Sequence, residues 1–184
     1  MTYTAPVDDI ALALETAAGL SGLVKSGMFD DLDEDTIRAV IEEAGKFGAE
    51  TLQPLNAKGD KSGSKLADGH VTTADGWQAA YKSWAAGGWA ALPCPPEFGG
   101  QGLPHIVSTA VGEIWASANL AFSLGPLLTQ GAIDALLAHG SDHLKKTYLP
   151  KMVSGEWTGT MNLTEPHAGS DLGQIGRASC RERV

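Results

Sequence analysis

The sequence predicts a mainly α protein, a bundle of about six helices that ends at the start of a β segment. Apolar residues recur at helical spacing through most of the chain up to about residue 155, and glycines and prolines separate these stretches. From residue 157 the pattern changes to threonine-rich alternation. We therefore expect an α-helical domain over residues 1–156, followed by the first strand of a β domain over 157–173.

Two helices are expected in the first third of the chain. Pro6 and the acidic residues after it suit the start of an apolar helix. Asp33 is a candidate N-cap for a second helix, whose apolar residues recur from Ile37 to Leu52. Pro54 is expected to mark its approximate end.

The middle of the chain alternates between loops and one helix. Residues 56–73 are rich in Gly, Asn, Asp and Ser and are predicted to form a loop. A helix is expected over 74–86, with Gly87 and Gly88 stopping it. Residues 93–104 hold four prolines and three glycines and predict a structured loop.

Three more helices are expected before the β segment. Residues 106–124 and 127–139 predict two apolar helices, which Gly125 and Pro126 separate. Ser141 is a good N-cap for a short helix that ends before Pro150.

The last two stretches differ in character. Residues 157–164 alternate in polarity and are rich in threonine, which is typical of a strand. Residues 174–184 contain three of the four arginines of the chain and show no strand alternation. We expect this tail to be non-native sequence appended to a truncated gene, and we exclude it from the fold prediction.

Composition narrows the function classes. The 184 residues carry a formal net charge of −9, which argues against nucleic acid or anionic lipid as a partner. Two cysteines make no disulfide framework, and the acidic start lacks a secretion-signal pattern. The most apolar stretch, 118–138, contains Asn119, Gln130, Asp134 and a Gly-Pro pair, so no membrane span is expected. A cytoplasmic location is the resulting expectation.

Three motifs in order resemble the acyl-CoA dehydrogenase family. Residues 96–103, Pro-Glu-Phe-Gly-Gly-Gln-Gly-Leu, match a proline- and glycine-rich loop of that family. Residues 140–150 and the following Ser-Gly-Glu at 154–156 look like its Gly-Ser…Lys…Tyr-Leu-Pro helix. Residues 163–171 resemble its Thr-Glu-Pro-x-Ala-Gly-Ser-Asp signature. The opening, within residues 1–33, is similar to the N-terminal extension of a bacterial subgroup that includes 3-methylmercaptopropionyl-CoA dehydrogenases.

The resemblance implies a helical N-terminal domain, a middle β domain and a helical C-terminal domain with FAD as cofactor. Such enzymes convert an acyl-CoA to its trans-2-enoyl thioester and pass electrons to an electron-transferring flavoprotein, commonly as homo-oligomers. By carry-over, the backbone of Met161 and Leu163 and the hydroxyl of Thr164 face the flavin. Ser170 contacts the acyl-CoA.

The resemblance also sets a limit. The second flavin-side strand, the pyrophosphate contacts and the catalytic glutamate of the family lie further along than this sequence extends. Glu165 belongs to the turn and does not replace that glutamate, and His167 stands where many members have glycine. We therefore expect no dehydrogenase activity and weak or no FAD retention by the chain alone.

Other interpretations remain open. Gly99-Gly100-Gln101-Gly102 could be a phosphate loop, but it follows prolines and lacks the Gly-Lys-Ser/Thr ending. His139 and His143 have a metal-ligand spacing, which Gly140-Ser141 interrupts. Gly169-Ser170-Asp171 lacks the Gly-x-Ser-x-Gly pattern of a hydrolase. The alternative from another class is a non-catalytic helical module that binds a protein partner, which would resist limited proteolysis as one core.

Overall fold

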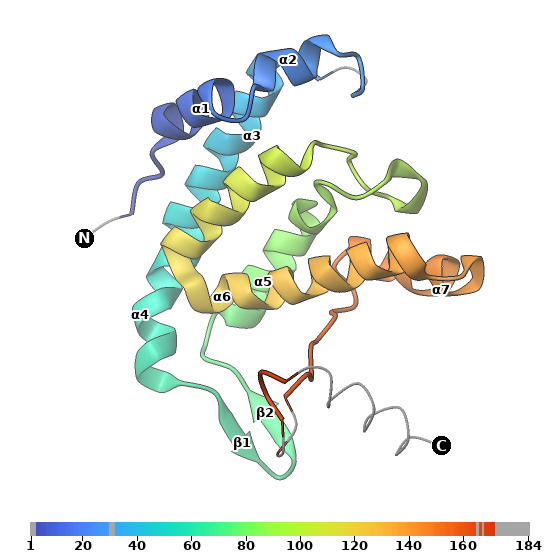
Figure 1. The fold of residues 1–184 in the computed structure, drawn as a ribbon. Helices are drawn as coiled ribbons and strands as arrows, with labels where there is room; N and C mark the ends of the chain where they lie inside the picture. Colours follow the sequence, from blue (N-terminus) through green and yellow to red (C-terminus); the bar gives the residue numbers. More distant parts are fainter. Residues whose placement is uncertain (1–2, 30–31, 165, 167, 172–184) are drawn as a thin grey trace.

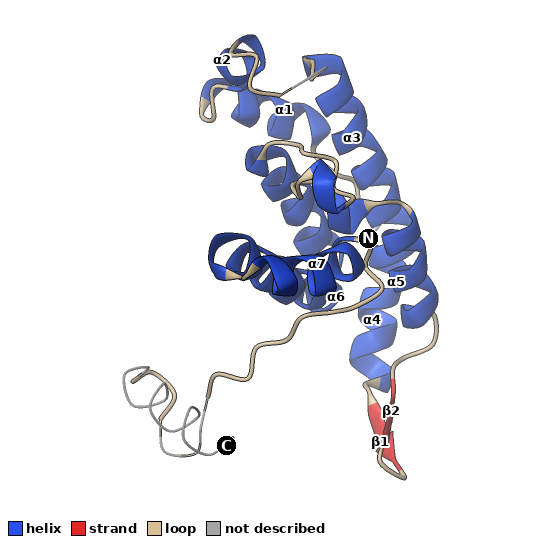
Figure 2. Cartoon of the chain, turned by 90° about the vertical axis from the view of Figure 1, so that its right-hand side faces the viewer, coloured by secondary structure: helices blue, strands red, loops and turns tan. Residues whose placement is uncertain are grey.

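The computed structural model describes residues 3–29, 32–164, 166 and 168–171. Within these residues the fold is a helical bundle with one small hairpin, which confirms the mainly α class (Figures 1 and 2). Its elements are α1 (Val7–Thr16), α2 (Leu20–Lys25), α3 (Glu34–Phe47), the π-helical turn η1 (Gly48–Leu52), α4 (Gln53–Ser62), β1 (Lys65–Ala67), β2 (His70–Thr72), α5 (Trp77–Ala86), the 3₁₀ turns η2 (Trp89–Ala91) and η3 (Pro96–Phe98), α6 (His105–His139) and α7 (Asp142–Val153).

A long helical rod begins where the sequence indicated. The Asp33 side chain accepts a hydrogen bond from the backbone N–H of Thr36 at 2.6 Å, so Asp33 is the predicted N-cap of α3. The rod does not end near Pro54 as expected, because η1 leads directly into α4, which continues to Ser62. Pro54 lies in the first turn of α4, where a missing N–H costs little.

A β-hairpin occupies part of the stretch that we predicted to be a loop. β1 and β2 pair antiparallel, with Leu66 opposite Val71. The turn between them uses Asp68 at φ 51° and Gly69 at φ 77°. Two successive positive φ values are what a type I′ hairpin turn requires, and Asp-Gly is a preferred pair for it. All six strand residues are exposed, and the hairpin projects from the bundle (Figure 2).

The break in α6 is not at Gly125-Pro126 as predicted but at Asn119. Asn119 is fully buried and has non-helical backbone angles, φ −159° and ψ 89°. Its side-chain oxygen accepts from the N–H of Phe122 at 3.1 Å, which makes it the N-cap of the second half of the helix. Its side-chain amide donates to the carbonyl of Leu52 at 3.1 Å. One polar side chain therefore bends α6 and ties the bend to η1.

The last helix is longer than predicted. Ser141 caps α7, accepting from the N–H of Leu144 at 3.4 Å, which confirms the expected start. The helix runs through Pro150 and ends at Val153. Leu149 and Val153 are buried in a small apolar cluster with Cys94 and Ile133, and this burial favours the continuation over a stop at the proline.

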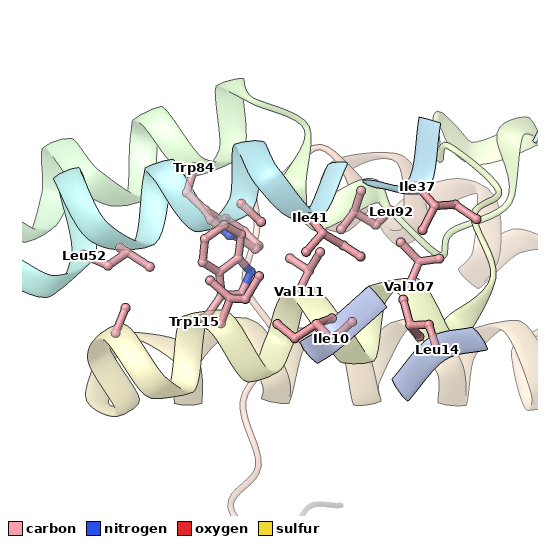
Figure 3. Packing of buried hydrophobic residues seen from close by; sticks show 14 of the residues in the cluster. Ile10, Leu14, Ile37, Ile41, Leu52, Trp84, Leu92, Val107, Val111 and Trp115 are labelled. Carbon is pink, nitrogen blue, oxygen red and sulfur yellow. The ribbon is translucent and has the colours of Figure 1, made fainter. Parts of the chain in front are cut away.

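Most of the core lies between α3, the first half of α6 and the helices that cover them. Ile41, Val107 and Val111 are each at most 1% exposed and pack together in this core (Figure 3). α6 is long and apolar enough to cross a membrane by length and composition alone. Only 17% of its most apolar window is buried in the bundle. Its first half is the central helix of this core, which requires apolar side chains there.

Residues 157–164 leave the bundle without forming the strand that we expected (Figure 2). Among the described residues, the only sheet is the β1–β2 hairpin. A strand needs a neighbouring strand to accept and donate its backbone hydrogen bonds, and no described strand pairs with 157–164. The assignment of 157–173 to a β domain stays a prediction. The tail 174–184 lies outside the described residues.

Candidate functional site

A large apolar cavity of about 460 Å³ lies between α5, η2, α6 and the end of α7. Four aromatic side chains contribute to its wall: Tyr81, Trp84, Trp89 and Trp115. A volume of this size is in the range of small-molecule sites, which are concave and mostly apolar. The cavity is therefore the candidate binding site of the helical domain.

The bend in α6 shapes this cavity. Trp115 reaches it from the first half of the helix, and Leu124 and Leu127 reach it from the second half. In an unbent helix with 3.6 residues per turn, Trp115 and Leu124 would lie on opposite faces. Leu124 and Leu127 are 52% and 63% exposed, so the cavity opens onto an apolar rim. Asn119, which produces the bend, is thus part of how the site is built.

The cavity is mainly apolar, and polar side chains such as His105 and Ser108 make up a minority of its lining. The Tyr81 hydroxyl donates to the carbonyl of Gly155 at 3.0 Å, and burial raises the pKa of this phenol. The amide of Gln130 donates to Asp134 at 2.9 Å. Among the described lining residues there is no Asp, Glu, Lys or Arg. The chemistry fits an uncharged aliphatic group and not a phosphate.

The glycine-rich loop supports the cavity from behind and does not bind phosphate through its backbone. The N–H groups of Gly100, Gln101, Gly102 and Leu103 donate to carbonyls of residues 91–95, at 2.8 to 3.0 Å. A phosphate loop needs free N–H groups that point toward the ligand. Here those groups are used within the protein, which confirms the structural interpretation of this loop.

Cys94 lies under this loop and is not a nucleophile. It is 1% exposed, and its thiol donates to the carbonyl of Ala90 at 3.6 Å. Burial, with a smaller contribution from the negative charge of Asp134, raises the pKa of Cys94 to about 11. Because the thiolate is the reactive form, this cysteine is inert near neutral pH.

Residues 157–171, which we call the exit segment, leave the cavity, and contacts at Trp157 and Gly159 hold the start of this segment against the bundle. The N–H of Trp157 donates to the carbonyl of Lys151 at 3.0 Å, and the Lys151 ammonium lies 4.4 Å from the centre of the Trp157 ring. Lys151 also pairs with Glu156 at 3.2 Å. Two residues later, the N–H of Gly159 donates to the hydroxyl of Thr129 at 3.1 Å. Thr129 lines the cavity, so the exit segment starts at the cavity wall.

The residues that we predicted to face the flavin follow Gly159 in the sequence. Met161 is 63% exposed and Leu163 40% exposed, and Thr164 is also exposed. The γ-methyl of Thr164 would lie 3.6 Å from a β-carbon placed on Gly169, so the chain folds back there. Ser170, the predicted acyl-CoA contact, is exposed beside it. The structure brings these residues onto one segment, and their roles stay predictions.

The structure also bears on the other residues that the sequence singled out, the two histidines among them. Glu165 and His167 lie outside the described residues. His139 ends α6 and His143 lies in the first turn of α7, with the break between them that the sequence indicated. No group of three metal-ligating side chains occurs among the described residues. The residues that sequence reasoning missed are Asn119 and Thr129, whose signal is a polar side chain within an apolar helical stretch.

Comparison with known proteins decides the family. Residues 34–156 match the family described as acyl-CoA dehydrogenase, N-terminal domain. The chain belongs to the acyl-CoA dehydrogenase family. The matched residues include α3 to α7, and therefore all the helices that surround the cavity. The extension before residue 34, with α1 and α2, lies outside this match.

Individual acyl-CoA dehydrogenases extend the comparison. The chain is 45% identical to 3-methylmercaptopropionyl-CoA dehydrogenase of Ruegeria pomeroyi over 95% of its own length and 30% of the relative. It is 29% identical to a butyryl-CoA dehydrogenase of Syntrophomonas wolfei, over 94% of this chain and 29% of that one. The chain thus spans about a third or less of the length of these two relatives.

Solved structures show the same fold. An acyl-CoA dehydrogenase from Bacillus anthracis, complexed with FAD, matches with a TM-score of 0.61 at 24% identity. The match covers 78% of this chain and 23% of that one. A chain from a study of the electron-transferring flavoprotein of Acidaminococcus fermentans matches with a TM-score of 0.62 at 20% identity, over 79% and 35% of the two chains. The helical arrangement is therefore that of known acyl-CoA dehydrogenase N-terminal domains.

Proposed function

We propose that this chain supplies the helical domain and the first flavin-side segment of an FAD-dependent acyl-CoA dehydrogenase. The observation that carries the proposal is the contact between Gly159 and Thr129. It joins a mainly apolar cavity, whose described lining has no Asp, Glu, Lys or Arg, to the segment that resembles the flavin-side sequence of the family. A cavity for an acyl chain and a wall for a flavin must be adjacent for α,β-dehydrogenation.

The residues of this chain would bind, orient and exclude water. The aromatic and leucine side chains of the cavity bind the aliphatic part of the acyl group, and the buried indoles of Trp84 and Trp115 keep water from the reacting carbons. The backbone of Met161 and Leu163 and the hydroxyl of Thr164 face the flavin, and Ser170 contacts the acyl-CoA. All four residues are exposed, as a site that receives a cofactor and substrate requires. FAD, when bound, accepts the hydride.

The finer assignments belong to the same proposal. The substrate would be an acyl-CoA thioester that is oxidised to the trans-2-enoyl-CoA, in the metabolism of fatty or related carboxylic acids. The electron acceptor would be an electron-transferring flavoprotein, the full enzyme a homo-oligomer, and its location the cytoplasm. The 45% identity to a 3-methylmercaptopropionyl-CoA dehydrogenase supports a short or sulfur-containing acyl group within this class.

A chimera tests the proposal. Residues 1–171 would replace the corresponding part of the Ruegeria relative, and the purified chimera would be compared with the intact relative and with the present chain. We expect flavin absorbance from the chimera and none in stoichiometric amount from the chain alone. A colourless, folded chimera beside a yellow parent would contradict the proposed function. Stoichiometric flavin on the chain alone would contradict the expectation of weak retention.

A further inference from the structure

One backbone contact fixes the place where the exit segment leaves the bundle. The Thr129 hydroxyl donates to the carbonyl of Gly125 at 3.3 Å and accepts from the N–H of Gly159 at 3.1 Å. Thr129 is 6% exposed, so its hydroxyl is held in a buried position on α6. A hydroxyl that both donates and accepts has a defined orientation, and it gives the Gly159 amide one favoured place.

Gly159 is there because no side chain fits. A β-carbon on Gly159 would lie 2.7 Å from the β-carbon of Ala132 and 3.3 Å from the α-carbon of Thr129. It would also lie 3.3 Å from the terminal methyl of Met152. The first of these distances is shorter than ordinary carbon–carbon contact. The close approach of the backbone to α6 therefore depends on the missing side chain and not on a left-handed conformation.

The position of this contact along the chain gives it a role. Residues 160–164 are all exposed, so the Gly159 contact is the last inward-facing backbone position before them. Met161 is two residues away, which limits the separation of the two α-carbons to about 7 Å. The contacts of Trp157 with Lys151 hold the chain two residues earlier. Among the hydrogen bonds of the described residues 157–164, the one at Gly159 lies nearest to Met161 in the sequence.

We propose that Thr129 and Gly159 are a positioning pair, which aims residues 160–164 at the flavin from the wall of the acyl cavity. The inference rests on the proposed function for its purpose and on the contact geometry for its mechanism. Thr129 touches the exit segment on one side and lines the cavity on the other. A shift of this pair would therefore misplace Met161, Leu163 and Thr164 without altering their chemistry.

Amide hydrogen exchange of the whole 184-residue chain tests the pair. Thr129→Val keeps the shape and removes the hydroxyl, and we expect exchange at Gly159 to rise roughly tenfold. Thr129→Ser keeps the hydroxyl and should restore exchange close to the original rate. Gly159→Ala should produce an increase at least as large, which Ala132→Gly in the same chain should reverse by removing the 2.7 Å clash.

The rescue separates positioning from plain stability. Ala132→Gly lowers helix propensity, so the double variant should be less stable overall while its exit segment is better placed. Unchanged exchange at Gly159 in Thr129→Val, or no rescue by serine and by Ala132→Gly, would overturn the positioning pair. The chimera with the Ruegeria relative gives the second measurement: Thr129→Val should weaken FAD binding roughly tenfold, and serine should restore it. If the unsubstituted chimera binds no FAD, the proposed function fails, while the exchange results still decide the pair.

Discussion

The helical region over residues 34–156 and the exit segment over 157–171 differ in how well their sequence patterns predict their secondary structure. The helical region buries its apolar side chains, and most of its backbone hydrogen bonds lie within single helices. The exit segment exposes Met161 and Leu163 and forms no strand in the described part of the chain. The sequence predicts helices in the first stretch and a strand in the second, and among the described residues only the helices are present.

This difference shows which secondary structures can form from hydrogen bonds between residues that are close in the sequence. A helix pairs each N–H with a carbonyl four residues earlier, so its pattern is sufficient once one face is buried. A strand pairs with residues that are distant in the sequence, so its pattern is only half of the structure. The β1–β2 hairpin follows the same rule, because only two residues separate its strands in the sequence and the strands can therefore pair locally. The contrast predicts that the amides of residues 160–164 exchange rapidly whether or not the helical region is perturbed, because these residues are already exposed.

The largest expected effect comes from Gly100→Ala. A β-carbon at Gly100 would lie 1.8 Å from the carbonyl oxygen of Cys94, so the loop must move and lose its hydrogen bonds to residues 91–95. We expect a loss of about 3 kcal/mol in the free energy of unfolding, measured by chemical denaturation. Gly131→Ala is the control, because a β-carbon there meets nothing within 4 Å and should be neutral or slightly stabilising. Comparable stability of the two variants would show that the loop is not tightly packed.

A middle-sized effect is expected from Asn119→Ala. The change removes the cap of the second half of α6 and the side-chain amide that donates to the carbonyl of Leu52. We expect a loss of about 2 kcal/mol. Asn56→Ala, at an exposed position in α4, should change stability by less than about 0.5 kcal/mol. A loss in Asn119→Ala no greater than in this control would remove Asn119 from the architecture of the bend.

The same substitution sharpens the comparison of the two regions. If the bend in α6 relaxes, the cavity between its halves should lose affinity for an apolar dye such as ANS. Exchange of amides 160–164 should stay as fast as in the unsubstituted chain, since these residues are already exposed. Slow exchange there in the unsubstituted chain would break the comparison, because it would reveal ordered structure in the exit segment.

The smallest effect is expected from Asp33→Ala, and it depends on pH. Hydrogen bonds from the side chain and backbone N–H of Thr36 hold the pKa of Asp33 below its usual value. Because the folded-state pKa is lowered, the cap stabilises fully above the unfolded-state pKa, and its contribution is lost as pH falls through the folded-state value. We expect Asp33→Ala to lower Tm by roughly 2–4 °C at pH 7 and by less at pH 3. Asp33→Asn should keep the cap and lose most of this pH dependence, and an equal loss at both pH values would contradict the capping role.

Much of the fold and part of the site could be predicted from local sequence. The caps at Asp33 and Ser141 are confirmed, because a capping side chain bonds to a backbone group only three residues away. The family was likewise visible in three short motifs, and the residue 34–156 match confirms it. The Asp68-Gly69 turn was also readable as a hairpin signal, but short flanking strands with exposed side chains hid it.

The sequence by itself determined most of the helices, the caps at Asp33 and Ser141 and the family, because each of these depends on residues that are near one another in the chain. Only the tertiary structure decided where α6 bends, since Asn119 had to find the carbonyl of Leu52 sixty-seven residues away. It alone decided where the exit segment starts, since Gly159 had to meet Thr129 across thirty residues. Long-range contacts of single polar groups inside an apolar core leave no periodic trace in a sequence, and these two contacts shape the cavity and direct the segment beside it.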